Sequence, residues 1–176
     1  MKFFTIIIAF ISFSCLAQEE IAYEFASYQN KEVTENNVPI VKVQQYWKIY
    51  TNGKLEVIDE NGKCTEIMLD KAILKQLNAS TKKGLEKFRD KKEPLVNHFY
   101  AGDYSFLKKG SETVCFNPYD VDKKLKKTLE NIEILIENGE NHTVSKCSLP
   151  ENLPELIQKT HSQSNLMPNA NPPPQM

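Results

Sequence analysis

Residues 41–69 read VKVQQYWKIYTNGKLEVIDENGKCTEIML, and this stretch decides the fold. Apolar and polar side chains alternate along it, and two Asn-Gly pairs interrupt the alternation, which is the strongest short-range signal of β-hairpins. A two-residue turn at Asn52-Gly53 would mix apolar and charged side chains across the strands. A three-residue turn with Gly53 in the left-handed region sets Trp47 opposite Val57 instead, so we predict this second register.

The second turn, Glu60-Asn61-Gly62, makes residues 40–69 a three-stranded antiparallel meander. One face is predicted to be apolar and to need a cover, and it carries Val41, Val43, Trp47, Ile49, Leu55, Val57 and Ile67. The other face is predicted to meet water. Tyr46 and Tyr50 lie there with Ile58 and form a possible interaction surface, because exposed aromatic patches mark binding sites. The alternative is that the first strand or the C-terminal tail covers them.

The whole pattern predicts an α+β fold, with an antiparallel sheet of five to six strands and a C-terminal amphipathic helix packed on one face. The strands beyond the meander are expected at residues 20–28, 97–107 and 111–116. Asp70 and Ser80 are expected to cap two short helices. An apolar stripe predicts a longer helix from Asp120 to Asn138, which should cover the apolar face and bury Trp47.

The N-terminal 17 residues have the features of a secretory signal peptide. Lys2 precedes an apolar run, and small residues stand at Cys15 and Ala17. We expect cleavage between Ala17 and Gln18, which would place the mature protein in the periplasm or outside the cell. The Lys-, Asn- and Ile-rich composition is typical of an exported bacterial protein. Acylation of Cys15, as in a lipoprotein, is the alternative.

The remaining chain is expected to comprise one domain and a tail. Residues 18–139 are predicted to form a single α+β domain, because 176 residues with 40% hydrophobic content are enough for one core. Residues 140–176 hold six of the nine prolines and are predicted to be a tail, largely disordered after about residue 160.

The net charge and the hydropathy restrict the partners. Removal of Lys2 with the leader leaves 21 of the 22 basic residues against 23 acidic ones, so the mature chain is weakly acidic. Acidic charge and export both argue against a nucleic-acid partner. No other run is long enough to span a bilayer, so we expect no transmembrane segment. The partner is expected to be an unidentified protein or small molecule.

Three cysteines remain after cleavage, and export favours a disulfide between two of them. We predict a bond between Cys115 and Cys147, with Cys64 free, because nine extended residues can return the chain from the end of the long helix. The alternative is a bond between Cys64 and Cys115. In that case both side chains would project from the polar face of the sheet, where a three-residue turn at residues 108–110 would place Cys115 beside Asp103.

No residue pattern predicts catalysis, a cofactor or a metal site. His98, His142 and His161 are far apart in the sequence. His98 with Asp103 and Ser105 supplies the residue types of a catalytic triad, but the alternation of a strand directs His98 away from the other two. The basic run at residues 123–127 indicates a solvated helix face.

The function that these observations favour is that of an exported binding or interaction protein rather than an enzyme. The alternative is a small extracytoplasmic hydrolase whose site is assembled from distant positions. A pocket with convergent acidic or histidine side chains of shifted pKa would favour the hydrolase.

Overall fold

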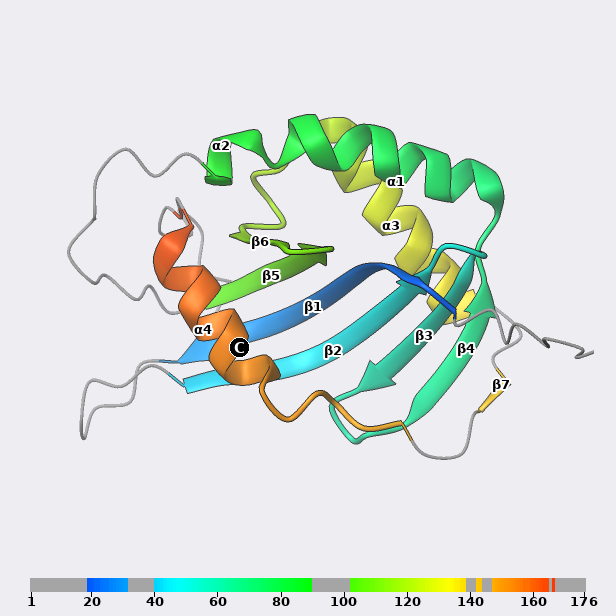
Figure 1. Cartoon of the computed structure of the whole chain (residues 1–176), viewed down its shortest axis with the longest axis horizontal. Helices are drawn as coiled ribbons and strands as arrows, with labels where there is room; N and C mark the ends of the chain where they lie inside the picture. The colour runs from blue at the N-terminus through cyan, green and yellow to red at the C-terminus, as the bar shows by residue number, and fades with distance from the viewer. Residues whose placement is uncertain are drawn as a thin grey trace, which may run out of the picture.

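The computed structural model describes residues 19–31, 40–89, 102–138, 142–143, 147–164 and 166. It has an antiparallel sheet with helices on both sides (Figure 1), which confirms the predicted α+β fold. The sheet order is β6-β5-β1-β2-β3-β4-β7. The strands are β1 (Ile21–Lys31), β2 (Ile40–Tyr50), β3 (Lys54–Asp59), β4 (Cys64–Met68), β5 (Gly102–Lys109), β6 (Glu112–Phe116) and the short β7 (His142–Thr143). The helices are α1 (Lys71–Gly84), α2 (Glu86–Arg89), α3 (Lys123–Asn138) and α4 (Leu153–Gln163).

The predicted register of the meander is confirmed. Trp47 of β2 pairs with Val57 of β3, and Val57 pairs with Thr65 of β4. Gly53 and Gly62 have φ angles of 97° and 76°, which residues with a side chain rarely adopt. The glycines of the two Asn-Gly pairs therefore set both turns and, with them, the register.

Buried side chains occupy both faces of the sheet. The face toward α1, α2 and α3, called here the α1–α3 face, carries Tyr23, Phe25, Trp47, Ile49, Leu55, Val57, Leu107, Val114 and Phe116. The opposite face, called the α4 face, carries Ala26, Tyr28, Tyr46, Ile58, Cys64, Phe106 and Cys115. The core thus extends through the sheet, and the prediction that the second face meets water is wrong for these residues.

A β-bulge in β2 corrects the predicted apolar face. Ser27 of β1 pairs with Gln45, whereas the next residue, Tyr28, pairs with Val43, so Gln44 is an extra residue in β2. A bulge of this kind reverses the alternation of the strand. Val41 and Val43 therefore lie on the α4 face and not on the face of Trp47.

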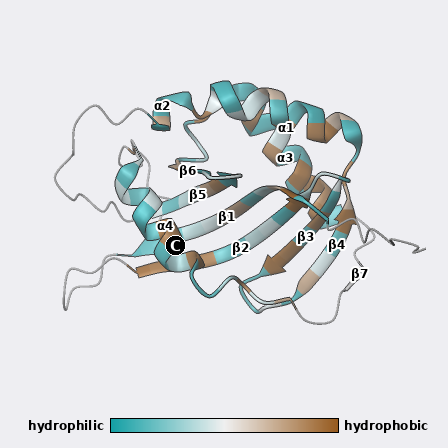
Figure 2. Cartoon of the chain, in the orientation of Figure 1, coloured by the Kyte–Doolittle hydropathy of each residue, from teal (hydrophilic) through white to brown (hydrophobic). Residues whose placement is uncertain are grey.

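The predicted helices form, with different ends. Asp70 caps α1 by accepting a 3.0 Å hydrogen bond from the backbone N–H of Ala72, as expected. Helix α1 then continues through Ser80, which we expected to cap a separate second helix, and ends at Gly84. Helix α3 begins at Lys123, and Asp122 accepts the hydrogen bond from the N–H of Lys124, a role expected of Asp120. Figure 2 shows that β3 and part of α3 are hydrophobic, whereas most of α1 is hydrophilic.

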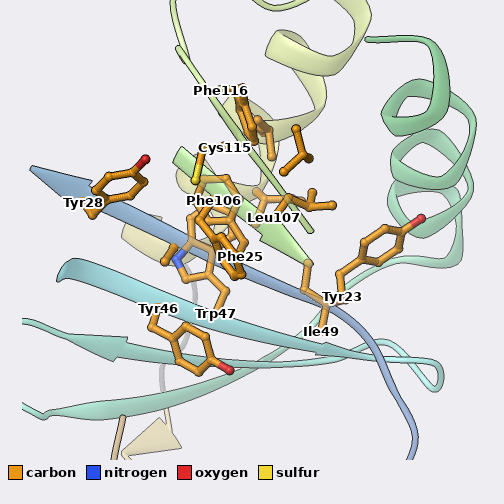
Figure 3. Close-up of a cluster of buried hydrophobic side chains, with 14 of the residues drawn as sticks. Tyr23, Phe25, Tyr28, Tyr46, Trp47, Ile49, Phe106, Leu107, Cys115 and Phe116 are labelled. Atoms are coloured by element: carbon orange, nitrogen blue, oxygen red, sulfur yellow. The ribbon is translucent and has the colours of Figure 1, made fainter. Parts of the chain in front are cut away.

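Trp47 is fully buried, as predicted, with an exposed fraction of 0%. Its indole stacks on the ring of Phe25, with 4.4 Å between the ring centroids (Figure 3). The two rings belong to neighbouring strands and form the centre of the α1–α3 face, because Phe25 pairs directly with Trp47.

The segment from residue 147 to residue 164, which we predicted to belong to a tail, packs on the sheet. Leu153 and Ile157 of α4 are buried on the α4 face. At the outer strand, the backbone N–H of Cys115 donates a 2.9 Å hydrogen bond to the hydroxyl of Ser164. The described part of this segment is therefore a layer of the fold, because its apolar residues complete the core on this side.

The hairpin of β5 and β6 differs from its predicted register. Leu107 pairs with Val114 and Phe106 with Cys115, around a turn that contains Gly110 at φ 58°. The turn is shorter than the three-residue turn that we expected, so the strands are shifted relative to each other. Cys115 consequently lies on the α4 face and is buried, rather than standing beside Asp103.

The predicted disulfide is wrong, because Cys115 lies on β6, at the opposite end of the sheet from β4. Cys147 is bonded to Cys64, with 5.6 Å between their Cα atoms, and Cys115 is a free, buried thiol. Burial raises the pKa of the Cys115 thiol to about 12. The disulfide joins β4 to the segment that leads into α4, so it fixes the start of the layer on the α4 face.

Candidate functional site

A cleft of about 330 Å³, called here the α3 cleft, opens between the α1–α3 face and helix α3. Its floor comes from β1, β2 and β5, one end comes from the loop before α3, and its wall comes from α3 itself. The lining residues are Phe25, Ser27, Gln44, Asp103, Tyr104, Ser105, Pro118, Tyr119, Lys126, Leu129, Glu130 and Glu133.

The floor of the α3 cleft is polar because the α1–α3 face changes character along its strands. Phe25 pairs with Leu107, but two residues further along, Ser27 pairs with Ser105, and Gln29 then pairs with Asp103. Residues two apart on a strand share a face. The apolar core therefore ends at Phe25, and the polar residues Ser27, Ser105 and Asp103 continue the floor of the cleft.

The amide side chains next to Asp103 are already oriented by its carboxylate. Gln29 and Gln44 each donate an N–H to Oδ1 of Asp103 over 3.5 Å. The bulge at Gln44 makes the second contact possible, because it turns this extra residue toward β5. Their carbonyl oxygens remain as hydrogen-bond acceptors.

The serine pair on the floor is less well satisfied. Ser105 is only 3% exposed, and Ser27 is half-buried beside it. Within the described ranges, neither hydroxyl has a hydrogen-bonding partner. Both hydroxyls line the cleft, so they are available to hydrogen-bond with a molecule bound there.

Helix α3 supplies the charged wall. Its buried stripe of Leu125, Leu129 and Ile132 turns the flank with Glu130 and Glu133 toward the cleft. Burial raises the pKa of Glu133, and the neighbouring charges of Glu130 and Glu137 raise it further. The wall therefore holds a carboxylate that a nearby positive charge would stabilise.

The α3 cleft is acidic overall. It contains the three carboxylates of Asp103, Glu130 and Glu133 against the single ammonium group of Lys126. Among the described residues, none of these four groups forms an ion pair. The negative charge of the cleft is therefore not neutralised by neighbouring side chains.

Tyr119 stands at the mouth of the cleft with 71% of its surface exposed. The preceding turn holds it there, since Asn117 accepts a 2.9 Å hydrogen bond from the N–H of Tyr119 through its side chain. An exposed aromatic ring fixed beside a polar cleft is typical of ligand sites.

The predicted interaction surface is not exposed. Tyr46 and Ile58 are 0% and 1% exposed, and Tyr50 is also buried. The hydroxyl of Tyr46 donates a 2.5 Å hydrogen bond to Glu24, and that of Tyr50 donates to Glu56 over 2.9 Å. Burial and the Glu56 contact raise the pKa of Tyr50 to about 12. These tyrosines are structural because charged neighbours on the sheet satisfy their hydroxyls.

The three histidines do not meet at one site in the described structure. His98 lies outside the described residues, and His142 is described only as part of β7. His161 is buried on α4, with Nδ1 2.6 Å from the hydroxyl of Tyr28. Asp103 and Ser105, the other members of the triad considered from the sequence, do line the same cleft.

Sequence reasoning missed most of the α3 cleft. Ser27, Gln44, Tyr119, Glu130 and Glu133 carried no local signal, because their convergence depends on the position of α3 over the sheet. The one available signal was the change from apolar to polar residues after Phe25 on β1.

Among the described residues, no group of three or more His, Cys, Asp and Glu side chains is arranged to hold a metal ion. No helix in the described ranges combines the length and the apolar character that crossing a membrane requires. Comparison with protein-family models, curated proteins and solved structures finds no match to the chain.

Proposed function

We propose that the mature protein is an exported, non-catalytic binding protein that holds a small molecule in the α3 cleft. The observation that carries this proposal is the convergence, in one cleft open to solvent, of the serine hydroxyls of Ser27 and Ser105 with carboxylates that form no ion pair in the described structure. Ligand pockets combine an apolar floor with a few placed polar groups, and Phe25 and Leu129 supply the apolar part here.

Export is part of the same proposal. The apolar leader with small residues at Cys15 and Ala17 supports cleavage before Gln18, and the disulfide between Cys64 and Cys147 is compatible with an oxidising compartment. The intact mass of the exported protein tests this part. A chain that begins at Gln18 is expected, whereas a diacylglyceryl group on Cys15 would replace this proposal with lipoprotein anchoring.

Binding is favoured over catalysis by the surroundings of the two serines. A serine nucleophile needs a general base within hydrogen-bonding distance. In the described structure, the hydroxyls of Ser27 and Ser105 contact no such group, and His161 lies on the α4 face. The serines therefore serve better as hydrogen-bonding groups than as nucleophiles.

The test is an NMR screen of the mature protein with small cations, anions and neutral sugars. Backbone resonances of Ser27, Asp103, Ser105 and Glu133 should shift together with at least one class. Ser27→Leu, which fills the floor of the cleft, should abolish these shifts. Ala79→Leu on the exposed side of α1 is the matched control and should preserve them. The proposal is wrong if ligands shift only resonances outside the cleft or if no compound shifts the cleft.

One observation favours hydrolysis as a second candidate. Glu133, whose pKa is raised, lines the same cleft as Asp103, and two carboxyl groups of different pKa are the usual pair for acid–base chemistry. Chromogenic glycoside and ester substrates test it. Turnover that Glu133→Gln and Asp103→Asn both remove, but that Glu155→Gln on α4 preserves, would establish the hydrolase in place of the binding protein.

A further inference from the structure

We propose that the ligand of the α3 cleft is a small organic cation that carries a primary ammonium group. This inference rests on the proposed binding function and adds the chemical class of the ligand. It depends on the charge of the cleft, on its hydrogen-bonding groups and on its aromatic rings, and each of these favours the same class.

The charge of the cleft favours a cation. Asp103 on the floor and Glu130 and Glu133 on the wall outnumber Lys126, and no described basic side chain pairs with them. A bound anion would add to this repulsion, whereas a cation would relieve it. Desolvation raises the pKa of Glu133 most, and the charges of Glu130 and Glu137 raise it further, so a nearby cation would stabilise its charged form.

The hydrogen-bonding groups of the floor favour a ligand that donates. Carboxylates only accept hydrogen bonds, and one amide N–H of Gln29 and one of Gln44 are directed to Asp103. What remains for a ligand is a larger set of carbonyl and carboxylate oxygens and a smaller set of donors, namely the second N–H of each amide, the hydroxyls of Ser27 and Ser105 and the ammonium group of Lys126. An ammonium group donates three hydrogen bonds and accepts none, so it matches this set.

The buried hydroxyl of Ser105 is evidence independent of the charge. Ser105 as a residue is 3% exposed and lines the cleft, and none of the side-chain hydrogen bonds between described residues involves its hydroxyl. Its position next to Asp103 on β5 provides one neutral and one charged acceptor for the same ammonium group.

The aromatic rings and the volume limit the size of the ligand. Phe25 on the floor and Tyr119 at the mouth offer ring faces, which attract cations. A cleft of about 330 Å³ has room for roughly ten water-sized groups, at about 30 Å³ each. A short diamine or a single amino sugar fits this space.

The test compares pairs of probes that differ in the ammonium group alone. Glucosamine is compared with glucose, and 1,4-diaminobutane with 1,4-butanediol, by calorimetry and NMR on the mature protein. We expect at least one amine to bind and to shift the cleft resonances of Ser27, Ser105 and Glu133. Each neutral twin should bind more weakly by about ten-fold or more, the effect of losing a charged hydrogen bond.

Three variants connect the binding to the cleft. Asp103→Asn should weaken binding of the amine by about ten-fold or more. Lys126→Met should strengthen it, because it removes the only positive charge of the cleft, and a purely structural role would not produce this opposite sign. Glu155→Gln on the α4 side removes one carboxylate far from the cleft and should leave the affinity unchanged.

The outcomes separate the two proposals. If neutral or anionic probes shift the cleft resonances as strongly as the amines do, the ligand class is wrong and the binding function stands. If the amines bind but Asp103→Asn has no effect, the site is wrong for this class. If no probe or screened compound shifts the cleft, the proposed function itself is overturned.

Discussion

The hydroxyl of Tyr28 on β1 lies 2.6 Å from Nδ1 of His161 on α4, and this buried hydrogen bond joins positions that are 133 residues apart. The ring of Tyr104 packs edge-on against the same imidazole, with 4.9 Å between the centroids. Polar and aromatic contacts thus hold α4 in one position, which apolar burial alone would not fix. The C-terminal segment is for this reason integral to the stability of the sheet.

We predict that Ile157→Ala lowers the free energy of unfolding by about 2–5 kcal/mol. Ile157 is fully buried between α4 and the sheet, so truncation leaves a cavity there. Urea unfolding followed by circular dichroism measures the change. Glu155→Ala, on the exposed side of the same helix, is the control and should change stability little. Equal effects of the two substitutions would mean that α4 does not pack on the sheet in solution.

We predict that Cys64→Ser lowers the free energy of unfolding by about 4 kcal/mol, the value expected for a long closed loop. The disulfide joins residues that are 83 positions apart, so its loss frees a large part of the unfolded chain. Peptide mapping without reductant should recover Cys64 linked to Cys147. A crosslinked peptide that contains Cys115 would contradict the pairing, and Cys115→Ala should leave the map of the other two unchanged.

We predict that Trp47→Ala lowers the free energy of unfolding by about 3–5 kcal/mol, because the indole is fully buried and stacks on Phe25. The fluorescence of this single tryptophan should have its maximum at short wavelength in the folded protein. Tyr119→Ala removes an exposed ring and should have little effect on stability. A solvent-like emission maximum in the folded state would rule out the burial.

We predict that Glu133→Gln stabilises the protein at neutral pH and has no effect in acid. Burial and the nearby carboxylates raise the pKa of Glu133, so the folded state binds its proton more tightly than the unfolded state does. The stability of the natural protein therefore falls as pH rises from the ordinary carboxyl pKa through the raised one. Glutamine removes this loss.

The measurement is urea unfolding of both proteins at pH 7 and at about pH 4, which is close to the ordinary pKa of glutamate. The variant should be the more stable protein at pH 7 and should match the natural one at the lower pH. Glu155→Gln serves as the control and should show no such gain. A destabilised Glu133→Gln variant at neutral pH would show that the carboxylate makes a favourable contact.

The meander could be predicted because its information is local. Two Asn-Gly turns and a strict alternation determine the pairing of Trp47 with Val57 without any other part of the chain. The turn of the second hairpin has only one glycine, Gly110, and the register of its strands depends on which residues meet α4 and α3. The sequence around Gly110 alone could not decide between turns of different length.

The remaining differences have long-range causes. The bulge at Gln44 is compatible with the local pattern but not required by it, and it changes the face of Val41 and Val43. Helix α4 lies in a proline-rich segment whose composition predicts disorder. The residues it contacts, Tyr28 and Cys115, are far from it in the sequence. The α3 cleft likewise exists only when α3 lies over the sheet, so its residues showed no shared pattern.

The hydrogen bond from the backbone N–H of Cys115 to the hydroxyl of Ser164 also affects whether another copy of the chain can pair with the edge of the sheet. Strand β6 is the last strand of its side of the sheet, and an unpaired strand edge is a template on which another chain can add a strand. Ser164 occupies a donor that such a strand would need. The C-terminal segment therefore blocks one position on this edge of the sheet, in addition to completing the core.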